Sequence, residues 1–234
     1  MSPRNSAAEP ASTEGSTWRE LAVARSLDPA RVRAEKRVQR FLDAALELMQ
    51  RSPDKEFTVQ EVVERSGQSL RSFYQYFAGK HELLLALFEE SVRSTAEYLR
   101  TQVEDETTPE GRLHRCATEY YLICRPSSRP RTGKSRPAPV AMAEFAQQLL
   151  TSHPEEASRA FVPLVTLLTE LLDDAASAGA IRKGLHHPHI AGVVLQAIMF
   201  NAFTTTISGA AGRQSGRDGA EELWDVIFRG IRPR

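Results

Sequence analysis

A chain of 234 residues is long enough to fold into one or two domains with a sizeable buried core. Its 30 basic and 30 acidic side chains give a formal net charge of zero, which excludes a uniformly basic nucleic-acid-binding protein and makes the local distribution of charge decisive. The two cysteines, Cys116 and Cys124, are spaced in a way that favours two free thiols on one helix over a disulfide framework or a zinc site.

The N-terminal residues lack the apolar core of a signal peptide, so we expect a cytoplasmic protein. Residues 190–207 are the best candidate for a membrane span, but Gln196, Asn201 and Thr204 interrupt them, which favours a buried helix and no membrane partner. Residues 1–16 are rich in Ser, Ala, Pro, Glu and Thr without apolar periodicity, and we predict a disordered extension there.

Two helices are predicted next. A short one covers residues 18–26, and Asp28-Pro29 then matches an N-cap followed by proline at the first position of a longer helix. The longer helix should run to about Gln50, because apolar residues at positions 38, 41, 42, 45, 46 and 49 follow helical spacing.

Residues 57–80 predict two more short helices, joined by a tight turn. Thr58 and Glu61 form a capping-box pattern ahead of three valines that share one helical face. Gly67 follows the last apolar turn, where a left-handed residue can end the helix.

The second of these helices has an apolar and a polar face. Ser69 is placed to cap it, and Phe73 and Phe77 recur at i and i+4 and should face inward. The other face carries side chains that can reach base edges or phosphates: Leu70, Arg71, Ser72, Gln75 and Tyr76. This pattern predicts a helix-turn-helix whose second helix enters the major groove of double-stranded DNA.

The predicted helix ahead of this motif is basic at its start. It carries five cations, Arg31, Arg33, Lys36, Arg37 and Arg40, against the single acid Glu35. A charge run is usually a solvated face, but its place just before a helix-turn-helix favours contact with phosphates, for which Arg33 and Arg37 are our candidates.

The motif resembles the DNA-binding motif of TetR-family transcriptional regulators. The resemblance rests on an ordered series of residues: Thr58, Gly67-Gln68-Ser69, Tyr74-Gln75-Tyr76-Phe77, Lys80 and Leu83-Leu84. Gln68, Leu70 and Arg71 depart from the family pattern, which leaves the base preference open. By motif position, the resemblance implies base contacts from Gln68, Leu70, Arg71 and Ser72. It implies phosphate contacts from Thr58, Ser69, Tyr74, Gln75, Tyr76 and Lys80.

The rest of the chain predicts helices and no strands, so the expected fold class is all-α. The expected helices cover residues 80–104, 109–124, 137–150, 155–178, 189–208 and 218–230, and Pro163 is expected to kink or delay the fourth of these. Residues 125–137 form a basic, proline-rich loop. A solvated loop is favoured there over a second contact with nucleic acid.

Two kinds of apolar surface are expected after residue 80. Aromatic side chains with a few hydroxyls suit a pocket for a mostly apolar small molecule, although each alone could be plain core: Phe88, Tyr98, Tyr120, Tyr121, Phe145 and Phe161. The helices at about 189–208 and 218–230 are too apolar to stay exposed, which predicts a homodimer.

The resemblance implies the same plan. Residues 17–79 would form a three-helix DNA-binding domain, and residues 80–234 a larger helical domain for ligand binding and dimerisation. The family precedent is a repressor that binds a palindromic operator as a dimer and is released by its ligand.

Two other functions compete with a DNA-binding regulator. An enzyme is not supported, because the chain shows no Ser-His-Asp order, glycine-rich phosphate loop or paired carboxylates on a shared face. His186-His187-Pro188-His189 could suggest a metal site, but a solvated helix cap is favoured, so no catalytic residue, metal ligand or cofactor is predicted. A helical adaptor that binds protein instead of specific DNA is the alternative, and salt-dependent binding to duplex DNA would separate the two.

Overall fold

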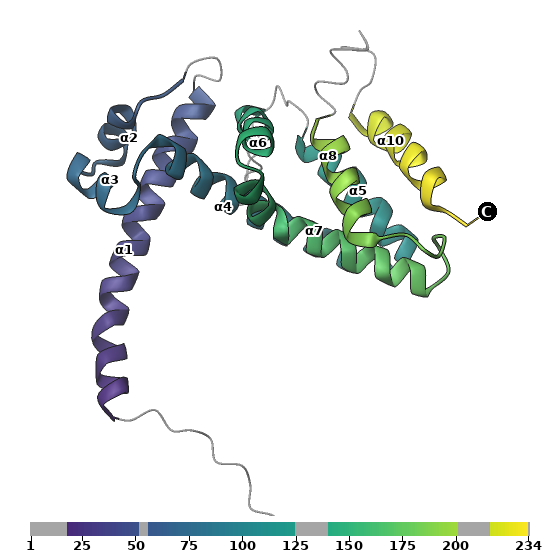
Figure 1. The fold of residues 1–234 in the computed structure, drawn as a ribbon, viewed down its shortest axis with the longest axis horizontal. Coiled ribbons are helices and arrows are strands. Elements are labelled where there is room, and N and C mark those ends of the chain that lie inside the picture. Colours follow the sequence, from purple (N-terminus) through teal and green to yellow (C-terminus); the bar gives the residue numbers. More distant parts are fainter. Residues whose placement is uncertain (1–17, 52–55, 125–139, 201–215, 234) are drawn as a thin grey trace, which may run out of the picture. The chain divides into compact units, whose positions relative to one another are not determined.

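The computed structural model describes residues 18–51, 56–124, 140–200 and 216–233 (Figure 1). These residues are mostly helical and contain no strand, which confirms the predicted all-α class. The helices follow in the order α1 Trp18–Arg51, α2 Val59–Ser66, α3 Leu70–Tyr76, α4 Lys80–Glu104, α5 Pro109–Cys124, α6 Val140–Ser152, α7 Pro154–Ser177, α8 His187–Met199 and α10 Gly216–Ile231. The predicted extension at 1–16 and the basic loop at 125–137 lie outside the described residues.

Contacts divide the chain into residues 1–40 and residues 41–234, and α1 crosses this division. The predicted functional boundary between residues 79 and 80 stays a prediction. Among the described helices, none combines the length and the apolar character that a membrane span requires.

The first helix differs from its prediction, because α1 continues through Pro29 without a break. A proline inside a helix removes one backbone hydrogen bond, but its fixed φ suits helical geometry, and Pro29 is exposed, so no polar group is stranded in a core. Side chains one turn on also support this stretch. Arg33 Nε donates to the Pro29 carbonyl at 3.0 Å, and Arg31 Nε donates to Glu35 Oε1 at 2.8 Å.

The helix-turn-helix frame, which comprises the end of α1, the helices α2 and α3 and the turn between them, forms as predicted. The N–H of Thr58 donates to Glu61 Oε2 at 2.7 Å, and the N–H of Glu61 donates to Thr58 Oγ1 at 3.2 Å, so both halves of the capping box at α2 are present. Gly67 ends α2 with φ at 64°, in the left-handed region that residues with a Cβ rarely adopt. Ser69 then caps α3 by accepting from the N–H of Ser72 at 3.1 Å.

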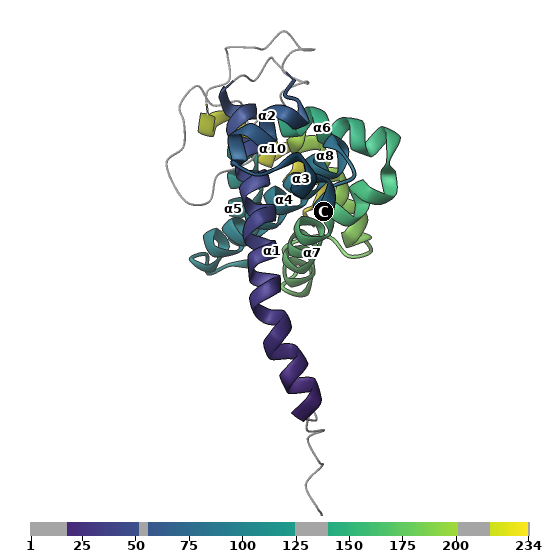
Figure 2. The same cartoon turned by 90° about the vertical axis from the view of Figure 1, so that its left-hand side faces the viewer.

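An aromatic cluster holds this frame together. Figure 2 shows the ribbons of α2 and α3, which lie next to each other. Phe73 on α3 is fully buried, and its ring meets that of Phe41, in the C-terminal third of α1, edge to face with the ring centres 5.4 Å apart. Phe77, which follows α3, lies 5.4 Å from Phe73 and is also buried. The predicted inward direction of both residues is therefore confirmed, and the apolar face of α3 leaves its other face to solvent.

Removing the capping box should weaken the frame measurably. In Thr58→Ala, the first turn of α2 loses a side-chain acceptor, and we expect a loss of about 0.5–2 kcal/mol in the free energy of unfolding. Urea unfolding followed by circular dichroism measures this loss. Thr58→Ser keeps the hydroxyl and should behave like the original chain, so an equal loss in both variants would contradict the capping explanation.

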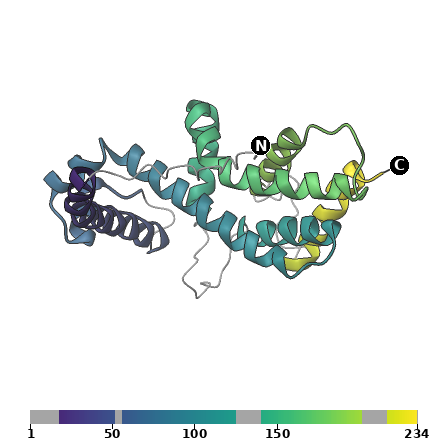
Figure 3. The ribbon, with the colours of Figure 1, turned by 90° about the horizontal axis from the view of Figure 1, so that it is seen from below.

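The following helices pack around α4 and α7. These two helices lie side by side, with α5 packed against both of them and α10 against α5 (Figures 1 and 3). Fully buried side chains from several helices fill the space between them: Leu83, Leu99, Tyr121, Leu149, Leu167 and Leu172. The predicted delay of α7 at Pro163 is wrong, because Pro154 already begins the helix at a position where a missing N–H costs nothing.

The last helices agree with their predictions where they are described. Gly179, with φ at 74°, follows α7, and the N–H of Arg182 donates to the carbonyl of Ile231 at 2.8 Å, which ties the chain after α7 to the end of α10. The helix predicted for 189–208 is described as far as Met199, and most of its remainder lies outside the described residues.

Both cysteines lie on α5 and are free thiols, as predicted. Burial raises the pKa of Cys116 to about 12. Burial also raises the pKa of Cys124 to about 12, against a smaller lowering by its hydrogen bond with Tyr120.

Candidate nucleic-acid interface

The outer side of α3 is open to solvent. Leu70 is 43% exposed and Tyr74 is 56% exposed, and Arg71 and Gln75 lie on the same side of this short helix. Arg71 forms no hydrogen bond or ion pair with any part of the chain that the structure describes. Its guanidinium can therefore bind a base edge without first breaking an internal interaction.

The other two candidates for base contacts are less free. Gln68 is half-buried and donates through Nε2 to the carbonyl of Gly67 at 3.3 Å. The Ser72 hydroxyl is buried and has no hydrogen-bond partner among the described residues. A base contact from Ser72 would require a different side-chain rotamer, so Arg71 and Leu70 are the better-placed pair.

Several candidates for phosphate contacts take part in the frame itself. The Thr58 hydroxyl accepts from Glu61 N–H and donates to Glu61 Oε2 at 3.0 Å. The Ser69 oxygen accepts from the N–H of Ser72, which leaves its own proton for a phosphate. Of the aromatic and amide candidates, Tyr74 and Gln75 are exposed and Tyr76 is half-buried.

Lys80 begins α4 and has an internal anion beside it. Its Nζ lies 3.1 Å from Glu56 Oε2 and 4.9 Å from the centre of the Phe57 ring. The Glu56 side chain is 95% exposed, so the carboxylate can swing away. A phosphate would take the place of Glu56 at this position.

The leading part of α1, described by itself, carries the basic run. Arg33 and Arg37 are both exposed. The role proposed for them on phosphates therefore remains a prediction.

One ion pair that supports the helix-turn-helix was not predicted from the sequence. Arg65 on α2 donates through Nε to Glu47 Oε2 on α1 at 2.7 Å. This pair joins two helices of the frame across 18 positions of sequence. No local spacing rule predicts such a contact.

The six aromatic residues predicted to line a pocket fall into two groups. The Phe88 ring meets two other phenylalanine rings edge to face. Its centre lies 6.0 Å from that of Phe145 and 5.3 Å from that of Phe161. Tyr98 donates to Glu119 Oε2 at 3.1 Å, and burial raises the pKa of the neighbouring Tyr120, with the two nearby cysteines adding to the effect. Tyr121 is buried as well.

Two surface depressions of about 500 and 410 Å³ lie elsewhere. The first is lined by residues of α5 and α10 and the turn after α7, including His114 and Trp224. The second lies between α4 and α7 and is lined by charged side chains, including Arg93 and Arg159. None of the six aromatic residues lines either depression, and their role in a pocket stays a prediction.

The helices predicted to form the dimer interface expose apolar side chains. Val193 on α8 is 49% exposed, and Val226 on α10 is 67% exposed. At the start of α8, His186 accepts from the N–H of His189 and so acts as the predicted cap. His187 Nδ1 pairs with Asp173 of α7, an acidic residue 14 positions earlier in the sequence.

Residues 41–87 match the model of the bacterial regulatory proteins of the tetR family. The matched segment runs from the second half of α1 through α2 and α3 into α4, so it covers the whole frame described above. Residues 41–87 therefore carry the motif of the tetR-family regulators. The proteins that this model describes are bacterial regulators, so the match favours a regulator over an enzyme.

Proteins of similar sequence or fold agree with this match. A fatty acid metabolism regulator protein of Bacillus subtilis (strain 168) is 20% identical over 145 residues, which make up 62% of this chain and 71% of the regulator. The crystal structure of the transcriptional regulator FadR from Bacillus subtilis in complex with stearoyl-CoA is similar, with a TM-score of 0.61 and 15% identity. That match covers 83% of this chain and 99% of that one.

The fatty acid degradation regulator FadR from Bacillus halodurans has a TM-score of 0.60 and 17% identity, and the match covers 84% of this chain and 97% of that chain. At these identities, the two solved structures establish a shared fold. The likeness extends well beyond the helix-turn-helix into the later helices.

Proposed function

We propose that this chain is a TetR-family repressor that binds a palindromic operator as a homodimer and leaves it when a mostly apolar small molecule binds. The observation that supports the DNA-reading part is the exposed side of α3, where Arg71 has no partner among the described residues. A capped, aromatic-centred frame fixes the direction of this helix. Acting on chromosomal DNA would place the protein in the cytoplasm.

The dimer part of the proposal is supported by the last two described helices. Val193 and Val226 expose large apolar surface that a second copy would cover. Two copies related by a twofold axis would present two α3 helices, which suits an operator with two inverted half-sites. The predicted interface covers about 189–208 and 218–230.

The effector part is supported by the later helices. Phe88, Phe145 and Phe161 come from three different helices and meet at one point, where a shift of α6 would open an apolar space. Because one structural relative was crystallised with stearoyl-CoA, long-chain acyl thioesters are the first effector class to test.

Selection of genomic DNA fragments by the purified chain tests this function. We expect enrichment of a palindromic sequence whose affinity falls steeply with salt concentration. Stearoyl-CoA should then release the protein from that sequence, and coenzyme A without an acyl chain should not. If no sequence is enriched at moderate salt, with or without the acyl thioester, the operator reading fails and a protein-binding adaptor becomes the better account.

A further inference from the structure

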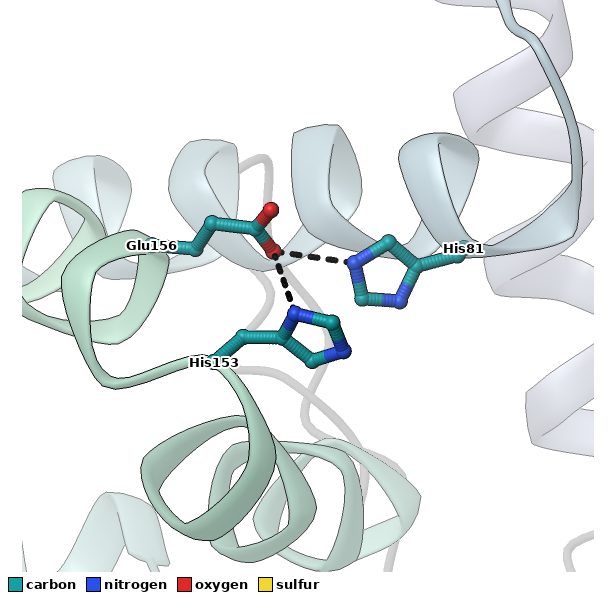
Figure 4. Close-up of side chains that lie close together, drawn as sticks. All are labelled: His81, His153 and Glu156. Carbon is teal, nitrogen blue, oxygen red and sulfur yellow. Dashed lines mark hydrogen bonds and ion pairs between the residues drawn. The ribbon is translucent and has the colours of Figure 1, made fainter.

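Two histidines and a glutamate converge at a place that DNA reading does not use (Figure 4). The Nε2 atom of His81 lies 2.9 Å from Glu156 Oε2, and the Nδ1 atom of His153 lies 3.9 Å from the same oxygen. One donor atom from each of the three side chains lies within 4.8 Å of the other two. In the part of the chain that the structure describes, this is the one group of three such residues.

The cluster joins two elements that are far apart in sequence. His81 is the second residue of α4, whereas His153 immediately precedes α7 and Glu156 lies in its first turn. His153 occupies the N-cap position of α7, but its side chain makes no capping hydrogen bond. Its imidazole instead faces His81, with the ring centres 4.7 Å apart. Helix capping therefore does not explain why a histidine stands there.

The donor set has a definite chemical preference. Two imidazole nitrogens and one carboxylate oxygen suit zinc and its first-row neighbours, whereas magnesium and calcium prefer sites made of oxygen. Nitrogen and oxygen ligands lie about 2.0–2.2 Å from a tetrahedral zinc ion, so they are a little over 3 Å apart. Small rotations of exposed side chains would bring the three donors to that spacing. All three side chains are partly exposed, which leaves a fourth position for water.

We propose that His81, His153 and Glu156 form a binding site for a divalent transition-metal ion such as Zn²⁺, which fastens the start of α4 to the start of α7. The sequence alone predicted no metal ligand. The one stretch that suggested a metal site was His186 to His189. There, His186 caps α8 and His187 pairs with Asp173, so those imidazoles already have partners.

Charges of both signs lie near the cluster of His81, His153 and Glu156. The hydrogen bond from His81 lowers the pKa of Glu156, with His153 and Arg159 adding to the effect, so Glu156 is an anion at neutral pH. Arg159 is the nearby positive charge that opposes a bound cation. Metal binding requires the carboxylate and both imidazoles in their unprotonated forms.

A bound ion would also bear on DNA reading, and this consequence rests on the proposed function. Lys80 precedes His81 directly and is a predicted phosphate contact, and α3 ends at Tyr76, only a few residues earlier. An ion that fixes the first turn of α4 against α7 would restrict how α3 is presented. Operator affinity should therefore change when the site fills.

Titration of the tag-free full chain with Zn²⁺ by calorimetry tests the site without any DNA. We expect one ion per chain, and Glu156→Gln and His153→Asn should each weaken binding on the order of 10- to 100-fold or more. Glu156→Gln keeps a hydrogen-bond acceptor for His81, so its folding should be preserved. His189→Asn removes an exposed imidazole from another place and is the matched control. Co²⁺ in place of Zn²⁺ should give a visible absorption spectrum that Glu156→Gln abolishes.

Three outcomes would overturn the site: no binding to the original chain, equal binding to Glu156→Gln, or a loss of binding in His189→Asn as large as in His153→Asn. The first of these would leave a hydrogen-bonded His–Glu pair only. The link to DNA is tested separately on the selected operator, where Zn²⁺ should shift the affinity of the original chain and not that of Glu156→Gln. A bound ion without such a shift would refute the link but not the site, and a protein that binds no operator would refute the proposed function but not the site.

Discussion

Phe73→Ala should destabilise the helix-turn-helix by about 3–5 kcal/mol, the range for removing a buried aromatic ring. Phe73 is fully buried, and its ring contacts both Phe41 and Phe77, so its loss leaves a cavity where α1 and α3 meet. A drop of that size approaches the whole stability of a small domain. We therefore expect loss of DNA binding as well as a lower urea midpoint.

The neighbouring residue provides the control for this substitution. Tyr74 is next in the chain and has a ring of similar size, but it is 56% exposed. Its ring also meets the Phe73 ring edge to face, with the ring centres 5.4 Å apart. Tyr74→Ala should therefore lower the free energy of unfolding by only about 0.5–1.5 kcal/mol, because it removes one ring pair and little buried surface. Equal destabilisation by both substitutions would show that the cluster around Phe73 is not the centre of the frame.

Arg71→Ala should relax the preference of the protein at one base pair in each half-site. A guanidinium that donates two hydrogen bonds to a guanine discriminates against other bases by about 1–3 kcal/mol, which corresponds to roughly 5- to 160-fold in affinity. Arg71 is exposed and has no partner in the described structure, so its removal should leave the fold intact. Binding to a set of operators that differ at single positions measures the effect.

Two further variants separate direct base reading from charge at this position. Arg71→Lys keeps the charge but loses the two-pronged geometry, so it should recover affinity more than discrimination. Arg100→Ala removes an exposed arginine from α4, where it pairs with Glu170, and should leave the preference unchanged. A uniform weakening on every operator by Arg71→Ala would show that Arg71 binds phosphate instead of a base.

The helix-turn-helix could be predicted well from the sequence because its signals are local. The capping box of Thr58 and Glu61, the left-handed Gly67 and the cap at Ser69 each act within about one helical turn, and all four residues behave as predicted. The predictions at Pro29 and Pro163 failed, because both prolines lie inside continuous helices. At Pro29 the helix continues because the residue is exposed and the lost hydrogen bond remains open to water.

Contacts between distant segments were beyond the reach of spacing rules. His81 and Glu156 are 75 positions apart, and they meet only because α4 and α7 lie side by side. The same is true of the aromatic residues chosen for a pocket. Their composition suggested one site, but packing places Phe88, Phe145 and Phe161 in one cluster and Tyr98 beside Glu119.

The low reactivity of the two thiols on α5 makes it possible to label this protein at a chosen position. Burial raises the pKa of both thiols to about 12, so very little of either cysteine is ionised at neutral pH, and the thiolate is the form that reacts with maleimides. A third cysteine on the exposed side of α3, as in Gln75→Cys, would therefore be labelled far faster than Cys116 or Cys124. A fluorescent dye can thus be attached to α3 while both native cysteines stay in place.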